Sequence, residues 1–340
     1  MVNVSGTYDI AAQYCHPTGP VSFPSLQILT HGIGFNASYW DFLASSDQSA
    51  GEYSYISAAT KKGYSTISYS RLGISGSTLA DPDKEVQTPV ALAILSQITQ
   101  LAREGGLFDG QPKPSKVFHV GHSYGSILAN ALVAAQPSSS DGLILTAYSH
   151  NPEYYSLYAA NTNFLIASIA DPARFPSAQY PNGYVTWPSQ WVNQYNYFAY
   201  PNFDDVILEL GEATKQPFPI AELLSFSLLN LDAPDFEGPV LYVNGEKDLI
   251  MCASNCTGMI QEGTAAFKAF RGTTDIESQV VSGAGHALHY HHGAQEMSGK
   301  MLDWVKRHDE VSRVKLGHAT CGRKGCLLLS KTNDLEGTQI

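Results

Sequence analysis

The chain has 340 residues, 44% hydrophobic and 15% charged, which is enough apolar sequence for one large core with an inserted subdomain or for two domains. Its net charge of −11 and the lack of a Lys/Arg cluster exclude the basic face that nucleic-acid binding requires. No apolar run approaches the roughly 20 residues of a membrane span, so none is expected.

The cysteines and the N-terminus bear on localisation. Residues 1–6 lack the basic region and apolar core of a signal peptide. The cysteines form two close pairs and a remainder: Cys252 with Cys256, Cys321 with Cys326, and Cys15. This spacing predicts two local disulfides and one free thiol, and neither pair has the C-x-x-C spacing of a zinc site, so no metal is expected. With three sequons, at Asn3, Asn36 and Asn255, we expect a secreted mature protein, with a cytoplasmic one as the alternative.

The first predicted elements are strands. Residues 6–14 alternate partly and predict an antiparallel edge strand, and residues 26–30 predict a buried strand. The latter runs into His31-Gly32-Ile33-Gly34, whose backbone N–H groups would lie at the carboxyl edge of the sheet. We expect Ile33 N–H to stabilise an oxyanion, with Gly34 as second choice. A tight strand exit without chemistry is the alternative.

The next part of the chain continues the alternation of strand and helix. Residues 64–70 predict a strand, and residues 86–104 predict a helix that tolerates Pro89 in its first turn. The loop at 71–77 is rich in glycine and serine, but it has no G-x-G-x-x-G pattern and no phosphate-binding lysine follows. The sequence therefore excludes a nucleotide site there.

A short motif stands between a predicted strand at 116–120 and a predicted helix at 126–135. It reads Gly121-His122-Ser123-Tyr124-Gly125, which is G-x-S-x-G. A strand that turns sharply into a helix on small residues exposes its central side chain, which makes Ser123 a candidate nucleophile. Tyr124 N–H, at the helix start, is a candidate oxyanion donor. A glycine-rich turn with an ordinary serine is the alternative.

Residues 142–146 predict another buried strand, so the sheet should be mostly parallel and covered by helices on both faces. The alternation then stops from 151 to 235, where many aromatic residues and several prolines crowd the chain. We interpret this part as an inserted helical lid over Ser123. Most of its rings would pack the lid itself, and Tyr158, Trp187 and Trp191 are candidates for substrate contact.

Two further polar residues follow the last predicted strands. Asp248 comes after the strand at 239–244 and can accept the N–H of an imidazole, with Glu246 as a competitor. His286 comes after residues 279–281 and a glycine-rich exit, and is the candidate base. Four other histidines compete with it: His31, His289, His291 and His292. A metal site in the last three has only Glu296 as a nearby acidic ligand and is not favoured.

The C-terminal part begins with an amphipathic helix predicted over 295–309. Beyond residue 312 the periodicity is weak, and we expect an extension outside the core. The domain division is therefore a core made of 1–150 and 236–311, a lid at 151–235, and an extension at 312–340.

The order Ser123, Asp248, His286, on strands of suitable spacing, resembles the α/β-hydrolase superfamily over about residues 24 to 309. A closer resemblance, to secreted fungal α/β hydrolases, is carried by His31-Gly32-Ile33-Gly34-Phe35, Ser38-Tyr39-Trp40-Asp41, Ser68-Tyr69-Ser70-Arg71-Leu72-Gly73, Gly121 to Gly125, and Cys252 with Cys256. The resemblance implies an eight-stranded sheet, a lid after the sixth strand, no cofactor, and hydrolysis of esters or related bonds.

From these residues we expect a serine hydrolase that cleaves an apolar or aromatic small-molecule ester or lactone through an acyl-enzyme. Ser123 would attack, His286 would take its proton, and Asp248 would orient His286. Two alternatives remain open, a C–C bond hydrolase or lyase on the same scaffold and a non-catalytic binding protein. A serine in place of a carboxylate nucleophile argues against dehalogenase and epoxide-hydrolase chemistry.

Overall fold

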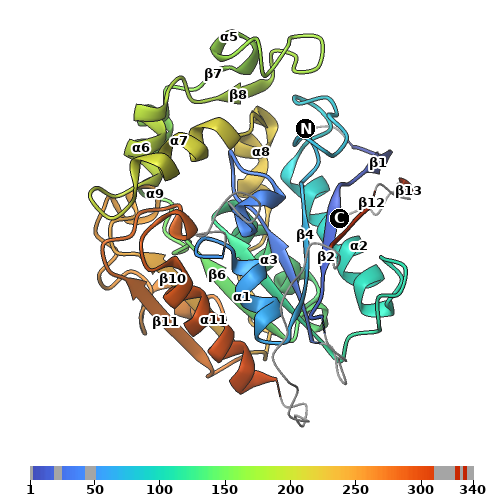
Figure 1. Cartoon of the computed structure of the whole chain (residues 1–340). Coiled ribbons are helices and arrows are strands. Elements are labelled where there is room, and N and C mark those ends of the chain that lie inside the picture. The colour runs from blue at the N-terminus through green and yellow to red at the C-terminus, as the bar shows by residue number, and fades with distance from the viewer. Residues whose placement is uncertain (1–2, 19–24, 43–50, 310–325, 330–331, 335–340) are drawn as a thin grey trace.

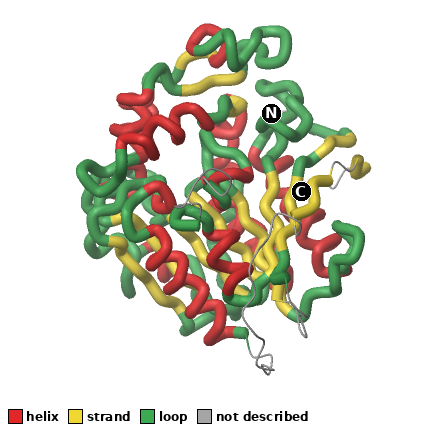
Figure 2. Tube along the Cα trace, in the orientation of Figure 1, coloured by secondary structure: helices red, strands yellow, loops and turns green. Residues whose placement is uncertain are grey.

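The structure, a computed structural model, describes residues 3–18, 25–42, 51–309, 326–329 and 332–334. Its centre is a sheet of eight strands, with helices around it (Figures 1 and 2). The strands are β2 (Ala12–Cys15), β3 (Ser25–Thr30), β4 (Ser65–Tyr69), β5 (Lys116–His122), β6 (Gly142–Thr146), β10 (Val240–Gly245), β11 (Ile276–Val281) and β12 (Cys326–Leu329). They lie in the order β11-β10-β6-β5-β3-β4-β2-β12.

Six of these strands, from β11 to β4, are parallel, and β2 and β12 pair antiparallel at one side. Residues such as Leu29, Val120 and Val243 are fully buried, as strands covered on both faces require. The predicted fold class, a mostly parallel eight-stranded sheet flanked by helices, is confirmed. Parallel strands also end at one edge, so β3, β5 and β10 deliver their following loops to the same place.

Helices cover both faces of the sheet. The helices of this part of the chain are η1 (Ala37–Trp40), α1 (Tyr55–Lys61), α2 (Thr88–Glu104), α3 (Tyr124–Ala135), η2 (Pro137–Ser139), α9 (Leu249–Cys252), α10 (Ala265–Lys268), η4 (Leu288–Tyr290) and α11 (Ala294–His308). Alternate strand residues enter different cores: Leu143 packs with α2 and α3, whereas Ile144 packs with α1 and α11. This division follows from the period of two in a strand.

The 151–235 segment lies in the chain between β6 and β10, and Figure 1 shows it at one end of the sheet. Its elements are α4 (Tyr155–Thr162), β7 (Leu165–Ile166), α5 (Ala167–Ala170), β8 (Tyr184–Thr186), α6 (Gln190–Tyr197), α7 (Asp205–Thr214), β9 (Phe218–Pro219), α8 (Ile220–Ser225) and η3 (Phe226–Leu228). The three strands form a small antiparallel sheet. The segment is therefore less purely helical than its aromatic composition suggests.

The C-terminal strands differ from the sequence-based expectation. Strand β12 pairs with β2 at the edge of the central sheet, and β13 (Thr332–Asp334) pairs with β1 (Thr7–Asp9). The described part of this segment therefore adds one strand to the central sheet and forms a separate two-stranded sheet with β1. In Figure 1 it lies beside the N-terminal strands.

The cysteine prediction is tested at three of the five residues. Cys252 and Cys256 form a disulfide, as expected. Cys15 is also disulfide-bonded, so its prediction as the free thiol is wrong. Cys15 lies on β2, which pairs with the distant strand β12, and such a pairing leaves no local pattern in the sequence. The predicted pairing of Cys321 with Cys326 falls on side chains outside the described part of the structure.

Within the described part of the chain, no helix is long and apolar enough to cross a membrane.

Candidate active site

Ser123 lies at the turn between β5 and α3, in a conformation that most residues avoid. Its φ is +54° and its ψ is −116°, in a region where a side chain strains the backbone. A Cβ at Gly125 would lie 2.0 Å from the carbonyl oxygen of Thr30, and one at Gly121 would lie 2.5 Å from Cα of Ser126. The two glycines are therefore required by close backbone contact, as the motif predicts.

A continuous hydrogen-bonded chain joins the three residues predicted to act together. Ser123 Oγ lies 2.8 Å from His286 Nε2, and His286 Nδ1 lies 2.8 Å from Asp248 Oδ2. All three side chains are buried, and Asp248 is fully so. Since His286 follows β11 and Asp248 follows β10, the shared edge of the sheet brings them to Ser123.

Asp248 is held in place by the short helix that follows it. Its Oδ1 accepts a hydrogen bond of 2.9 Å from Met251 N–H as the N-cap of α9, which leaves Oδ2 for His286. Glu246, the competing carboxylate, points elsewhere and accepts from Ser282 Oγ and Gly283 N–H. The ammonium of Lys247 and these donors lower the pKa of Glu246 to about 2. The structure therefore brings Asp248, and not Glu246, to His286.

The predicted oxyanion donors divide between two places. Ile33 and Tyr124 line the same cavity as Ser123, and a Cβ at Gly32 would lie only 3.1 Å from Cβ of Ser123. Tyr124 is the first residue of α3, whose first-turn N–H groups have no intrahelical acceptor. Gly34 does not line the cavity. Its φ of +79° and the Trp187 ring, 2.3 Å from where a Cβ would be, give this glycine a packing role.

A cavity of about 200 Å³ opens beside Ser123. It is lined by Ile33, Ser123, Tyr124, Ile127, Tyr155, Tyr158, Ala159, Tyr197, Leu223, Phe226, Ile250, Met251 and His286. Six of these residues come from the 151–235 segment and the rest come from the sheet edge. The walls are mostly aliphatic and aromatic, which suits the apolar part of a small ligand.

The three candidates for substrate contact lie in different environments. Tyr158 lines the cavity. Trp187 is buried behind it, packs on Tyr197 and donates from Nε1 to Glu212 Oε2 at 2.9 Å. Trp191 is 68% exposed on α6. The structure thus does not place either tryptophan in the cavity wall, because Trp187 precedes α6 and is buried behind the wall, whereas Trp191 lies on the solvent side of α6.

Other wall residues were not singled out from the sequence. Ile127, Ile250 and Met251 lie within a few positions of Ser123 or Asp248, and this nearness is a signal that could have found them. Leu223 and Phe226 arrive from α8 and η3, far along the chain. No local pattern distinguishes these two from other core residues.

The competing histidines have other partners. His31 accepts from Arg71 N–H at Nε2, and burial holds its pKa well below the usual value. His289 contacts the Tyr39 hydroxyl, and burial lowers its pKa to about 3. His291 accepts two backbone N–H groups, and the exposed His292 pairs with Asp204. None of these side chains lines the cavity.

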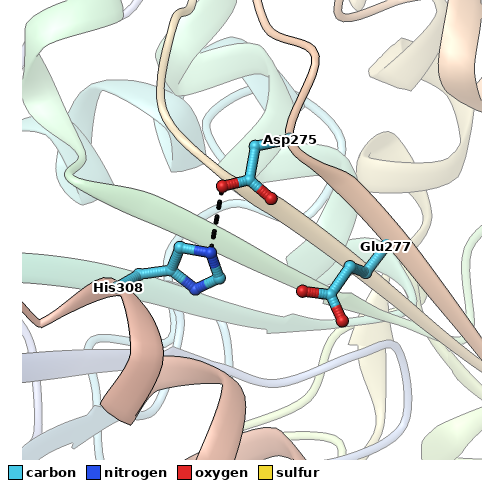
Figure 3. Close-up of side chains that lie close together, drawn as sticks. All are labelled: Asp275, Glu277 and His308. Atoms are coloured by element: carbon cyan, nitrogen blue, oxygen red, sulfur yellow. Dashed lines mark hydrogen bonds and ion pairs between the residues drawn. The ribbon is translucent and has the colours of Figure 1, made fainter.

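A separate group of possible metal ligands lies at the end of α11. Asp275, Glu277 and His308 each offer one atom, and these atoms lie within 4.8 Å of one another (Figure 3). His308 Nε2 already pairs with Asp275, and both oxygens of Glu277 accept from the Arg307 guanidinium at 2.7 Å. These ion pairs account for the cluster, since a guanidinium occupies the position that a cation would take at Glu277.

Comparison with known proteins gives one family match. Residues 27–297 match the Alpha/beta hydrolase family, which is well over half of the chain. No curated protein matches the chain significantly.

Many solved structures share the fold at low sequence identity. One is an esterase from Thermogutta terrifontis, with a TM-score of 0.58, 15% identity, and coverage of 88% of this chain and 94% of that one. A putative non-heme bromoperoxidase, BpoC of Mycobacterium tuberculosis H37Rv, gives 0.57 and 14%, covering 91% and 98%. A putative lipase of Acinetobacter baumannii AYE gives 0.57 and 14%, covering 91% and 93%. At such identities these similarities establish the fold alone.

Proposed function

The chain belongs to the alpha/beta hydrolase family, and on this premise we propose that it hydrolyses carboxylic esters or lactones with Ser123 as nucleophile. The single observation that carries the proposal is the chain of two 2.8 Å hydrogen bonds from Ser123 through His286 to Asp248, ending in a cavity. A hydroxyl bonded to an imidazole, itself bonded to a buried carboxylate, is the arrangement that activates serine for acyl transfer.

In the proposed first step, Ser123 Oγ attacks the carbonyl carbon while His286 Nε2 takes the hydroxyl proton. The 2.8 Å contact between these atoms provides the path for that proton. Asp248, fully buried, accepts from His286 Nδ1 and stabilises the imidazolium that forms. The N–H groups of Ile33 and Tyr124 then hold the oxyanion, and His286 returns the proton to the leaving alcohol.

In the second step, water attacks the acyl-serine, with His286 as its general base. The 151–235 segment supplies half of the cavity wall, so we assign it the part of a lid that excludes bulk water and binds the substrate. Its aromatic and aliphatic side chains favour an apolar or aromatic substrate.

We further propose that the protein is secreted and related to the secreted fungal members of the family. The Cys252–Cys256 disulfide and the bonded Cys15 support this proposal, because disulfides persist in oxidising compartments. Native mass determined with and without a reducing agent tests the disulfides directly, and fully reduced cysteines in the protein from its natural source would contradict secretion.

Hydrolysis of a p-nitrophenyl ester series, from acetate to long acyl chains, tests the chemistry. We expect turnover by the wild type and a fall in kcat of about 10⁴-fold or more in Ser123→Ala, the scale of loss when a triad member is removed. A His286→Ala variant should lose about as much, since the two residues act as one unit. His289→Ala is the matched control, because His289 does not line the cavity.

The outcome also separates the alternatives. If Ser123→Ala keeps its turnover, Ser123 is not the nucleophile. If the wild type hydrolyses no ester but a phosphonate probe labels Ser123, the site is competent for another reaction, such as C–C bond hydrolysis. If neither occurs, the remaining alternative is a protein that binds a ligand without catalysis.

A further inference from the structure

Two tyrosine residues that line the mostly apolar cavity hydrogen-bond to each other through their hydroxyl groups. Tyr158 Oη and Tyr197 Oη lie 2.6 Å apart, and both side chains are buried. Tyr158 is on α4 and Tyr197 is the last residue of α6, so the pair joins two helices of the 151–235 segment. Both residues line the cavity together with Ser123 and His286.

The pair has unused hydrogen-bonding capacity. Two hydroxyl groups carry two hydrogens, and their mutual bond uses one. The Tyr158 hydroxyl has the Thr162 side chain as a further hydrogen-bonding neighbour, whereas within the described residues the Tyr197 hydroxyl has Tyr158 alone. When Tyr158 donates to Tyr197, the Tyr197 O–H is left as a donor together with free oxygen lone pairs, and a buried polar group without a partner is costly. A ligand oxygen would supply the missing partner.

The surrounding rings hold this pair in place beside the reacting groups. The Tyr197 ring lies 5.7 Å from the His286 ring and 5.0 Å from the Trp187 ring behind it. The Tyr158 ring packs edge-on against Phe164 at 5.6 Å. Since the rings are fixed from behind, their hydroxyl groups have little freedom to turn away, and the pair is preorganised for a ligand.

The size and wall of the cavity limit what can reach the pair. An apolar cavity of about 150 Å³ in another protein holds benzene, so the 200 Å³ here admits one six-membered ring with a short linker. Tyr155 and Phe226, whose rings lie 5.6 Å apart in a T-shaped arrangement, form part of the wall. Aromatic walls of this kind favour an aromatic ring over a chain of similar volume.

We propose that the Tyr158–Tyr197 pair selects phenolic esters, in which one hydroxylated aromatic ring fills the cavity and its hydroxyl group binds the pair. The proposal rests on the ester-hydrolase function proposed above. The phenolic oxygen of the substrate accepts a hydrogen bond from the free tyrosine O–H, and the phenolic hydrogen is donated to a lone pair of a tyrosine oxygen. An ester with a methyl group in place of the hydroxyl would leave the pair unpartnered, and a site built for a hydroxyl discriminates strongly against such an analogue.

Two pairs of esters of nearly equal volume test this selection. The acyl pair is methyl 3-(4-hydroxyphenyl)propanoate and methyl 3-(4-methylphenyl)propanoate. The alcohol pair is 2-(4-hydroxyphenyl)ethyl acetate and 2-(4-methylphenyl)ethyl acetate. The ratio of kcat/KM within each pair is measured by chromatography of the products, and the pair with the larger ratio identifies which half of the ester occupies the cavity.

We expect the wild type to prefer the hydroxylated member of one pair by at least about tenfold, the scale of one hydrogen bond. Tyr158→Phe and Tyr197→Phe remove one hydroxyl each without changing the ring, and each should lower that ratio by about tenfold. The matched control is Tyr195→Phe, on the same helix α6 but 58% exposed, which should leave the ratio unchanged.

The outcomes separate this inference from the function on which it rests. A ratio near one in both pairs, or a preference that survives both substitutions, overturns the selection by the pair. Ser123-dependent hydrolysis of p-nitrophenyl acetate without turnover of the four esters overturns it as well. A protein that hydrolyses no ester at all and resists phosphonate labelling would instead overturn the proposed function.

Discussion

The turn around Ser123 and the 151–235 segment that faces it are held by different kinds of contact. At the turn, backbone meets backbone: a Cβ at Gly125 would lie 2.0 Å from the Thr30 carbonyl oxygen. The segment reaches the cavity through side chains, such as the Tyr158–Tyr197 pair. It also carries eight of the nine large apolar side chains that are exposed in the described part of the chain. The conformation of the turn is therefore fixed by close backbone contacts, whereas the segment is held by side-chain packing, which tolerates substitution.

This difference teaches where change is tolerated. A glycine in close backbone contact cannot be replaced without moving the backbone, since no rotamer can relieve the clash of an added Cβ with a main-chain oxygen. Side-chain contacts can be altered one at a time, and the pocket changes its shape while the reacting groups stay in place. Under the proposed function, we therefore expect substitutions in the segment to change the choice of substrate and substitutions at the turn to change the rate.

The largest expected effect is on the pH dependence of stability. It follows from a second contrast between the two regions, since all eleven histidines lie outside the 151–235 segment. Burial lowers the pKa of His119 and His289 to about 3, and that of His150 and His291 to about 4. Below about pH 6.5 the unfolded chain binds protons that the folded chain does not, so stability falls with falling pH down to about pH 4. Each histidine contributes up to about 1.4 kcal/mol per pH unit.

We therefore expect the free energy of unfolding to fall by several kcal/mol between about pH 7 and pH 5, as measured by urea denaturation. Glu222 opposes this trend, because burial raises its pKa to about 7 and it gains stability as the pH falls toward 4.5, but it is one group against several. His119→Gln should flatten the slope, whereas the exposed His292→Gln serves as control. A stability that does not change over this range would contradict the burial of neutral histidines.

The next prediction breaks the backbone contact. Gly125→Ala forces the turn away from Thr30, and it displaces Ser123 from His286. Because a misplacement of about 1 Å costs roughly 10²-fold in rate, we expect kcat to fall by at least that factor. Gly299→Ala on α11, where an added Cβ meets nothing within 4 Å, is the matched control. Wild-type kcat in Gly125→Ala would mean that the turn is less constrained than its contacts indicate.

The contrast between backbone contacts at the turn and side-chain contacts in the segment also explains which features could be predicted from the sequence. The core strands and the chain order of Ser123, Asp248 and His286 depend on local apolar runs and on glycines, which are visible in the sequence. The cavity wall depends on which face of a distant helix turns inward, so Trp191 was expected there and Tyr197 was not singled out. The bonding of Cys15 is not predicted for a related reason, since β2 pairs with a distant strand and such pairing leaves no local pattern.

A smaller effect is expected where the two regions meet. His291 Nε2 accepts hydrogen bonds from Gly285 N–H at 3.0 Å and from Ala199 N–H at 2.9 Å. One imidazole thus ties the loop that carries His286 to the residues after α6. His291→Ala removes both bonds, and we expect kcat/KM to fall by about tenfold, with the loss mainly in kcat. His291→Gln, whose amide oxygen can accept one of them, should recover part of the rate. Full activity in His291→Ala would show that the loop positions His286 without this contact.

The smallest effect is expected at Trp191. Its ring is 68% exposed and does not line the cavity, so Trp191→Ala should change kcat/KM for p-nitrophenyl acetate by less than about twofold. The same variant assayed with long-chain esters sharpens the contrast between the two regions. A rise in KM for long-chain esters alone would show that the binding surface continues from the cavity onto the exposed apolar side chains of the segment. An equal fall in kcat for all esters would instead place Trp191 in contact with the reacting groups, which its exposure contradicts. No change with either substrate would confine recognition to the cavity, where Tyr158 and Tyr197 supply the polar contact and the turn at Ser123 supplies the chemistry.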